Sequence, residues 1–166
     1  MQTEEGGCLC GAVRYRVTMP PQRGSVCHCT FCQRRTGSIA GFGAYFRNED
    51  VEFLKDGERR TYAHRSDETG RWLRLEFCTT CGTQVTWTIE AAPGLRAIGV
   101  GTLDNPKAIE LKRFGWFRSA HPWIVPPPGF EVNQTSTLPK TNDQCCNTCT
   151  ASFSSAPSNM NARCQP

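Results

Sequence analysis

The chain is organised around the stretch Cys27-His28-Cys29-Thr30-Phe31-Cys32, which places three cysteines at the spacing C-x-C-x-x-C. The single-residue gap lets two thiolates reach one ion from an extended turn. The two-residue gap lets the third thiolate reach the same ion from the next turn. Thiolates are soft ligands that suit zinc or iron–sulfur clusters, and zinc binds them with tetrahedral geometry. Three local sulfurs leave one tetrahedral position open, as in a catalytic rather than a structural zinc site.

Two further cysteine pairs lie on either side of this stretch, Cys8-Leu9-Cys10 upstream and Cys78-Thr79-Thr80-Cys81 downstream. Each pair supplies half of a tetrahedron. Together Cys8, Cys10, Cys78 and Cys81 predict a closed structural zinc site that joins two distant parts of the chain. We therefore expect two zinc ions per chain, one with four protein ligands and one with three.

Other interpretations of the cysteines remain open at this point. The seven could form disulfides or be unrelated thiols. Alternatively, His28, His64 or His121 could fill the fourth position of the second site, which would make both sites structural.

Composition limits the class of protein. The 166 residues carry 19 Lys and Arg against 15 Asp and Glu, a net charge of only +4. The basic residues are scattered pairs, so a solvated surface explains them better than nucleic-acid binding. No apolar run approaches the roughly 20 residues of a membrane span, and no signal peptide is recognisable. Eleven cysteines without a secretion signal favour metal thiolates in a reducing compartment, hence a cytoplasmic location.

The apolar pattern predicts a mainly β fold with little helix. Apolar residues alternate with polar ones at a period of two, and no long stretch has a period of 3.6. We expect roughly six to nine short antiparallel strands by this pattern, after a frayed start over residues 1–5. A short helical turn is predicted from Thr30, as its cap, through Arg35, with Gly37 ending it. The clearest strands are residues 13–17, 38–46, 73–77, 85–89 and 95–100, with a hairpin of 51–54 and 59–63 around the Asp56-Gly57 turn.

The composition changes near Asn133, so we predict one zinc-binding domain over residues 1–132 and a tail over residues 133–166. The tail is rich in Asn, Gln, Ser, Thr and Pro and is poor in large apolar residues, which predicts disorder. A third zinc site in the tail is a weaker alternative to disordered reactive thiols. Its cysteines are Cys145, Cys146, Cys149 and Cys164.

An open zinc site with three thiolates suits one kind of chemistry. The three negative charges weaken the ion as a Lewis acid toward water, whereas a substrate thiol entering the fourth position would bind as its thiolate. The nearest cations by sequence are Arg34 and Arg35, and His28 could donate a hydrogen bond or move a proton. The alternatives are a solvent-facing arginine pair and a packed histidine.

Three motifs also resemble the glutathione-dependent formaldehyde-activating enzyme family. They are Gly7-Cys8-x-Cys10-Gly11-x-Val13-x-Tyr15, then Cys27-His28-Cys29-x-x-Cys32-x4-Gly37-Ser38, and Phe77-Cys78-x-x-Cys81-Gly82, followed by Pro122-Trp123. The resemblance covers roughly residues 5 to 125. It implies a zinc-knuckle β-tent fold, a structural zinc on the four-cysteine set and a catalytic zinc on Cys27, Cys29 and Cys32.

The activity that the resemblance implies is that of a zinc-dependent carbon–sulfur lyase, which joins glutathione and formaldehyde to S-hydroxymethylglutathione or runs the reverse reaction. The implied partner is a small thiol such as glutathione. The Cys-rich tail and Ala120-His121-Pro122-Trp123 depart from the family's pattern. Two alternatives remain, a zinc-stapled binding module without chemistry and an enzyme of the same fold acting on another thiol. No sequence feature fixes the oligomeric state or the direction of the reaction.

Overall fold

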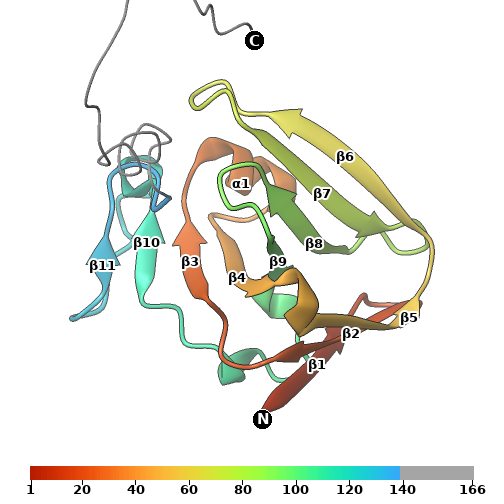
Figure 1. Cartoon of the computed structure of the whole chain (residues 1–166). Coiled ribbons are helices and arrows are strands. Elements are labelled where there is room, and N and C mark those ends of the chain that lie inside the picture. Colours follow the sequence, from red (N-terminus) through yellow and green to blue (C-terminus); the bar gives the residue numbers. More distant parts are fainter. Residues whose placement is uncertain (139–166) are drawn as a thin grey trace, which may run out of the picture.

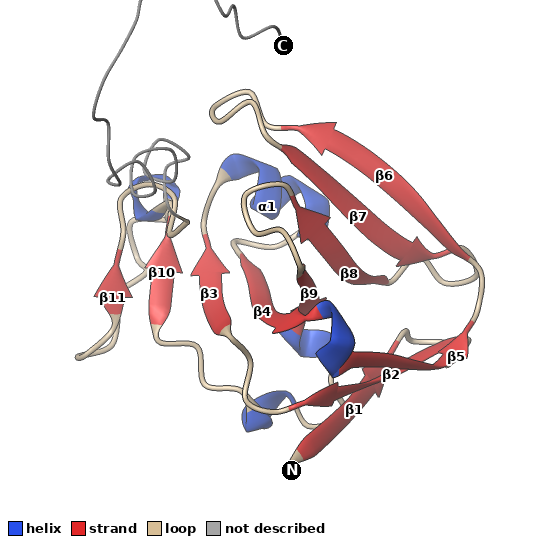
Figure 2. Cartoon of the chain, viewed as in Figure 1, coloured by secondary structure: helices blue, strands red, loops and turns tan. Residues whose placement is uncertain are grey.

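A computed structural model of the chain describes residues 1–138, and it is mainly β, as the pattern predicts. Eleven strands and one α-helix, α1 (Thr30–Thr36), make up the regular structure of the described residues, together with four 3-10 turns (Figures 1 and 2). This is more than the expected six to nine strands. The strands are β1 (Thr3–Gly7), β2 (Val13–Thr18), β3 (Arg23–Cys27), β4 (Gly41–Arg47), β5 (Val51–Asp56), β6 (Arg59–Arg65), β7 (Trp72–Cys78), β8 (Gln84–Ile89), β9 (Leu95–Gly99), β10 (Arg113–Gly115) and β11 (Glu131–Val132). The 3-10 turns are η1 (Asn48–Asp50), η2 (Val100–Thr102), η3 (Pro106–Ala108) and η4 (Phe117–Ser119).

A small antiparallel sheet of order β1-β2-β5 closes one end of the molecule. Its central strand β2 buries Val13, Tyr15 and Val17 completely, as the alternation predicts. The expectation of a frayed start over residues 1–5 is wrong, because residues 3–7 form strand β1 and pair with β2 along their whole length. The apolar pattern misses β1 since it contains two glutamates and two glycines and no large apolar residue.

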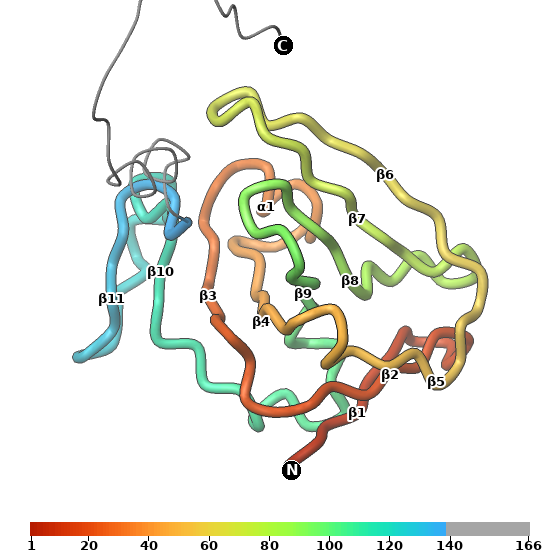
Figure 3. The backbone as a smooth tube through the Cα atoms, in the orientation of Figure 1, coloured from red at the N-terminus to blue at the C-terminus, as the bar shows by residue number. Residues whose placement is uncertain are grey.

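The large sheet has the order β11-β10-β3-β4-β9-β8-β7-β6 and curves over the small one. It is antiparallel from β3 to β6, while β10 pairs parallel with both β3 and β11. The tube in Figure 3 shows the long β6–β7 hairpin arching away from the small sheet, with α1 at the far end of β3. The result is a tent-like arrangement of two sheets.

The predicted hairpin of residues 51–54 and 59–63 is wrong. Strand β5 pairs with β2 in the small sheet, whereas β6 pairs with β7 in the large sheet. At Asp56-Gly57 the chain therefore passes from the small sheet to the large sheet. The amide of Gly57 donates to the carbonyl oxygen of Ala12 at 3.1 Å, and a Cβ on Gly57 would lie 2.5 Å from that oxygen. Glycine is needed for this close approach, which a turn pattern cannot distinguish from a hairpin.

The main core lies between the two sheets and includes two of the cysteines. Tyr15, Phe46 and Ile98 are fully buried there, and Cys8 and Cys78 belong to the same cluster. A second cluster surrounds Trp87 on the β6–β9 side, and a third surrounds Phe114 beneath β10.

Residues 133–138 run beside η4 and β10. The amide of Trp116 donates to the carbonyl oxygen of Thr135 at 2.8 Å, and that of Phe117 donates to Asn133 at 3.0 Å. The four tail cysteines lie outside the described residues. Among residues 1–138, no helix has the length and apolar character needed to cross a membrane.

Candidate metal centre

The structure brings Cys8, Cys10, Cys78 and Cys81 together, with their sulfurs all within 4.8 Å of one another. The Cys8 and Cys10 sulfurs are 3.5 Å apart, and those of Cys10 and Cys78 are 3.7 Å apart. A zinc tetrahedron with Zn–S bonds of about 2.3 Å has sulfurs about 3.8 Å apart. The four thiols therefore fit a closed metal site that ties the β1–β2 turn to the β7–β8 turn.

Gly82 and Thr83 shape the turn that carries Cys78 and Cys81. Gly82 has φ 72°, a left-handed conformation that favours glycine, and its amide donates to the carbonyl oxygen of Cys78 at 2.9 Å. The Thr83 hydroxyl lies 3.2 Å from the Cys81 sulfur. Hydrogen bonds from the Thr83 side chain and backbone lower the pKa of Cys81 to about 5. This turn therefore favours the thiolate form, which is the form that binds metal.

The second cluster is local to β3 and α1, and the sulfurs of Cys27, Cys29 and Cys32 also lie within 4.8 Å of one another. The Cys27 thiol donates to the Cys29 sulfur at 3.5 Å. The Cys29 sulfur also accepts the amide of Cys32 at 3.3 Å, so Cys29, and not Thr30, caps α1. Gly37 ends the helix at φ 63°, as predicted. The N-terminus of α1 therefore positions two of the three candidate ligands, Cys29 and Cys32.

No fourth ligand from the described part of the chain completes this cluster. Within residues 1–138, the group of metal-ligating atoms around Cys27 contains only the three cysteines. His64 stacks on Phe31 with ring centroids 4.0 Å apart, and His121 is exposed beside Trp123. All seven cysteines of the two clusters are free thiols, so the disulfide alternative does not hold for them. The structure favours four ligands at one site and three at the other.

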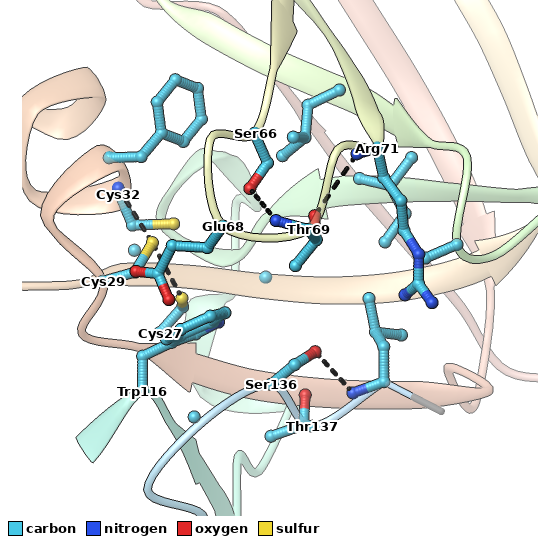
Figure 4. A pocket seen from close by; sticks show the side chains of 18 of the residues that line it. Cys27, Cys29, Cys32, Ser66, Glu68, Thr69, Arg71, Trp116, Ser136 and Thr137 are labelled. Carbon is cyan, nitrogen blue, oxygen red and sulfur yellow. Dashed lines mark hydrogen bonds between the residues drawn. The ribbon is translucent and has the colours of Figure 1, made fainter. Parts of the chain in front are cut away.

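The three-cysteine cluster opens into a cavity of about 190 Å³ (Figure 4). A single water needs only roughly 10–15 Å³ by the same kind of measure, so the space is large enough for a ligand. Its walls come from β3, β4 and α1, from the β6–β7 loop, from Trp116 and from residues 136–138. The cavity and the open side of the cluster therefore form one site.

Arg35 supplies a positive charge at this site. Its guanidinium lies 4.4 Å from the ring centre of Trp87 and donates to Oε1 of Gln84 at 2.6 Å. Hydrogen bonds from the Cys27 and Cys29 thiols, together with the Arg35 cation, lower the pKa of Cys32 to about 2. Arg34 is exposed and does not line the cavity. Of the two arginines that the sequence offers, only Arg35 reaches the cluster.

His28 is placed away from the cavity. Its side chain is only 2% exposed and packs against Phe114 and Phe117, with ring centroids 5.4 and 5.6 Å away. Neither ring nitrogen has a hydrogen-bond partner among the described residues, and burial lowers its pKa. His28 alternates with Cys27 and Cys29 along extended backbone, which turns it to the opposite face. The structure favours a packed histidine over one that moves protons for a substrate.

Several cavity residues were missed by sequence reasoning. They come from three separate segments: the loop of residues 66–71, Trp116 and residues 136–138. Glu68 of the loop forms an ion pair with Arg118 of η4. No local signal marks these residues, because the topology brings them together. Arg23 could have been found, since it shares the period-two face of β3 with Cys27.

Three comparisons with known proteins agree with this description. A curated relative from Halomonas elongata, named "Putative glutathione-dependent formaldehyde-activating enzyme", is 29% identical over 89 residues, which are 52% of this chain and 55% of the relative. The chain thus matches about half the length of that relative. A crystal structure of a Rhodobacter sphaeroides protein is 25% identical, with a TM-score of 0.50, over 64% of this chain and 96% of that one. The family model described as glutathione-dependent formaldehyde-activating enzyme matches residues 3–119. The chain therefore belongs to the glutathione-dependent formaldehyde-activating enzyme family.

Proposed function

We propose that this protein is a zinc-dependent carbon–sulfur lyase that joins glutathione and formaldehyde to S-hydroxymethylglutathione, or catalyses the reverse reaction. The observation that carries the proposal is the contrast between two thiol clusters, one closed by four cysteines and one with three cysteines facing a cavity. Family membership supports the choice of glutathione and formaldehyde.

The donor sets suit zinc. In this proposal Cys8, Cys10, Cys78 and Cys81 hold a structural ion, and Cys27, Cys29 and Cys32 hold a second one. At the second site a bound zinc would offer an open position at which a thiol loses its proton and binds as thiolate. The cysteines contribute geometry, because the cap of α1 fixes Cys29 and Cys32 before a substrate arrives.

The protein's own side chains position the reactants and balance charge. Arg35 offsets the negative charge that a substrate thiolate adds to three cysteine thiolates. The cavity walls hold the sulfur next to the carbonyl carbon of formaldehyde, which turns a bimolecular step into a local one. The thiol releases its proton to water on binding. The carbon–sulfur bond then forms, the carbonyl electron pair moves to oxygen, and that oxygen takes up one proton from water, so no net proton is gained or lost. The reverse reaction returns the same electrons and proton.

Binding without chemistry is the second candidate, because the same fold could serve as a zinc-stapled recognition module. Such a module needs an exposed surface for its partner rather than a thiol cluster that opens into a cavity. The open cluster therefore favours the enzyme.

The test is the exchange rate between formaldehyde plus glutathione and their adduct, followed by NMR with and without the zinc-loaded protein. The adduct forms spontaneously, so only a rate above the protein-free control counts. We expect a clear acceleration that Cys32→Ser abolishes. If the zinc-loaded protein gives only the protein-free rate, the proposed reaction is wrong.

A further inference from the structure

Besides Arg35, two arginines line the cavity, Arg23 and Arg71, and the proposed reaction at the thiol cluster uses neither of them. Arg23, Ser25 and Cys27 follow one another on the same face of β3, and all three line the cavity. At about 3.3 Å per residue, the Cα atoms of Arg23 and Cys27 are roughly 13 Å apart. Arg35 already supplies the positive charge next to the cysteines. Arg23 is therefore attached to β3 well away from the thiol cluster, and its guanidinium reaches Thr137, which also lines the cavity.

Two glycines on the neighbouring strand shape the cavity wall between the thiol cluster and Arg23. Gly41 and Gly43 of β4 stand directly opposite Cys27 and Ser25 in the antiparallel register. A Cβ on Gly43 would lie 2.6 Å from the Trp87 ring, and one on Gly41 would lie 2.8 Å from the Arg35 guanidinium. The glycines therefore let the Trp87 ring and the Arg35 guanidinium pack directly on β4, where both side chains line the cavity beside Cys27 and Ser25.

Arg23 is half-buried and is not neutralised by an acid. Its guanidinium donates to the carbonyl oxygen of Thr137 at 2.6 Å and lies 5.9 Å from the ring centre of Tyr45. No carboxylate of residues 1–138 forms an ion pair with it, and the nearby Glu131 is paired with Arg113 at 2.6 Å. A partly buried cation of this kind is stabilised by an anionic partner. A planar guanidinium also matches the geometry of a carboxylate.

From this geometry we infer that Arg23 is a specificity residue, which binds a carboxylate of the thiol substrate while the substrate's sulfur lies at Cys27, Cys29 and Cys32. The ligand class is a thiol whose carboxylate is many bonds away from its sulfur, as in a small peptide thiol. A two-carbon thiol cannot reach both groups. The inference rests on the proposed function for the position of the sulfur and adds the group that selects the rest of the molecule.

The test measures binding, so that it does not depend on the reaction. S-methylglutathione keeps both carboxylates of glutathione but has no thiol, and its diethyl ester has neither a thiol nor a free carboxylate. The affinity of the zinc-loaded full-length protein for each compound is measured by calorimetry. The variants are Arg23→Gln, Arg23→Lys and, as a control with the same loss of charge outside the cavity, Arg34→Gln.

We expect Arg23→Gln to weaken binding of S-methylglutathione by roughly tenfold to a hundredfold, the range for a lost hydrogen bond to a charged group. The lysine variant should lose less, and Arg34→Gln should match the wild type. The diethyl ester should bind the wild type as weakly as it binds Arg23→Gln. The ratio of the two affinities within one variant is independent of the folded fraction, so a partly unfolded variant does not obscure the result.

Equal affinity of the wild type for acid and ester, or equal binding by wild type and Arg23→Gln, would overturn the assignment of Arg23. The two proposals fail separately. If the protein accelerates adduct formation but Arg23→Gln binds S-methylglutathione as tightly as the wild type does, the carboxylate subsite is wrong and the proposed function stands. If Arg23→Gln weakens binding but the protein does not accelerate adduct formation, the proposed reaction is wrong and the subsite stands.

Discussion

The two cysteine clusters use the same ligand type but differ in where their ligands come from. The four-cysteine cluster joins residues that are 68 positions apart, at the boundary of the main core, and leaves no ligand position open. The three-cysteine cluster takes its sulfurs from six consecutive residues and opens into a cavity beside Arg35. Ligands drawn from distant segments stabilise a fold, whereas ligands that are local and too few leave room for a substrate.

The largest effect is expected from Cys81→Ser. Cys81 is partly exposed, so the change costs little packing and acts through the metal. We expect the free energy of unfolding to fall by several kcal/mol, a part of the roughly 10–16 kcal/mol with which structural zinc sites bind their ion. Thermal unfolding followed by circular dichroism measures it. Thr80→Ser is the control, since it lies in the same turn without being a ligand; unchanged stability of Cys81→Ser would mean that the cluster does not hold the fold.

Cys32→Ser should separate function from folding. The variant should bind one zinc ion fewer and lose activity by about a hundredfold or more, as expected when a catalytic metal loses a ligand. Its circular dichroism spectrum should match the wild type, because the main core does not include Cys32. Thr36→Ser, at the other end of α1 and outside the lining of this cavity, is the control. If Cys32→Ser unfolds as fully as Cys81→Ser does, the two clusters do not have separate roles in catalysis and in stability.

A smaller effect is expected from the charge beside the open cluster. Arg35→Gln should lower kcat/KM by roughly tenfold to a hundredfold, because the thiolates lose a charged hydrogen-bond partner. Arg34→Gln removes the same charge one residue away, on the exposed side of α1, and should leave kcat/KM unchanged. Equal losses in the two variants would mean that only the overall charge of the helix matters.

The smallest effect is expected near the four-cysteine cluster, where Arg14 forms a bidentate pair with Asp104. Their side chains are 26% and 55% exposed, so Asp104→Asn should cost no more than about 1 kcal/mol. The hydrogen bond with Arg14 lowers the pKa of Asp104 in the folded protein. The stabilisation is therefore complete above the unfolded pKa of about 3.9 and disappears as the pH falls through the lower folded value. The difference in unfolding free energy between wild type and variant, measured from pH 7 downward, tests this sign.

The sequence could predict the features that depend on residues close together in the chain. The spacing of Cys27, Cys29 and Cys32 predicts one shared cluster, and alternation predicts β2, β7 and β8. The resemblance to the family is confirmed by the match over residues 3–119. The cap of α1 was assigned one residue too late, because a cysteine that accepts an amide is an uncommon cap.

Most features that depend on distant partners could not be predicted. The four-cysteine cluster is an exception, because the spacing within each cysteine pair indicates half of a shared zinc site. The pairing partner of β5 is β2, more than thirty residues earlier, so the Asp56-Gly57 signal indicated the wrong neighbour. The cavity wall combines residues 66–71, Trp116 and residues 136–138. Trp116 has φ 54°, a conformation that its residue type does not suggest. The position of His28 depends on Phe114 and Phe117, which lie near its ring only once β10 pairs with β3.

Stepwise removal of zinc would separate the roles of the two cysteine clusters. A chelator is added in increments to the zinc-loaded protein, and bound metal, activity and circular dichroism are recorded at each step. We expect the first ion to leave together with the activity while the spectrum stays unchanged. The fold should be lost only with the second ion, because three ligands hold metal less tightly than four. Loss of both ions and of the fold in a single step would contradict the division between an open site for chemistry and a closed site for stability.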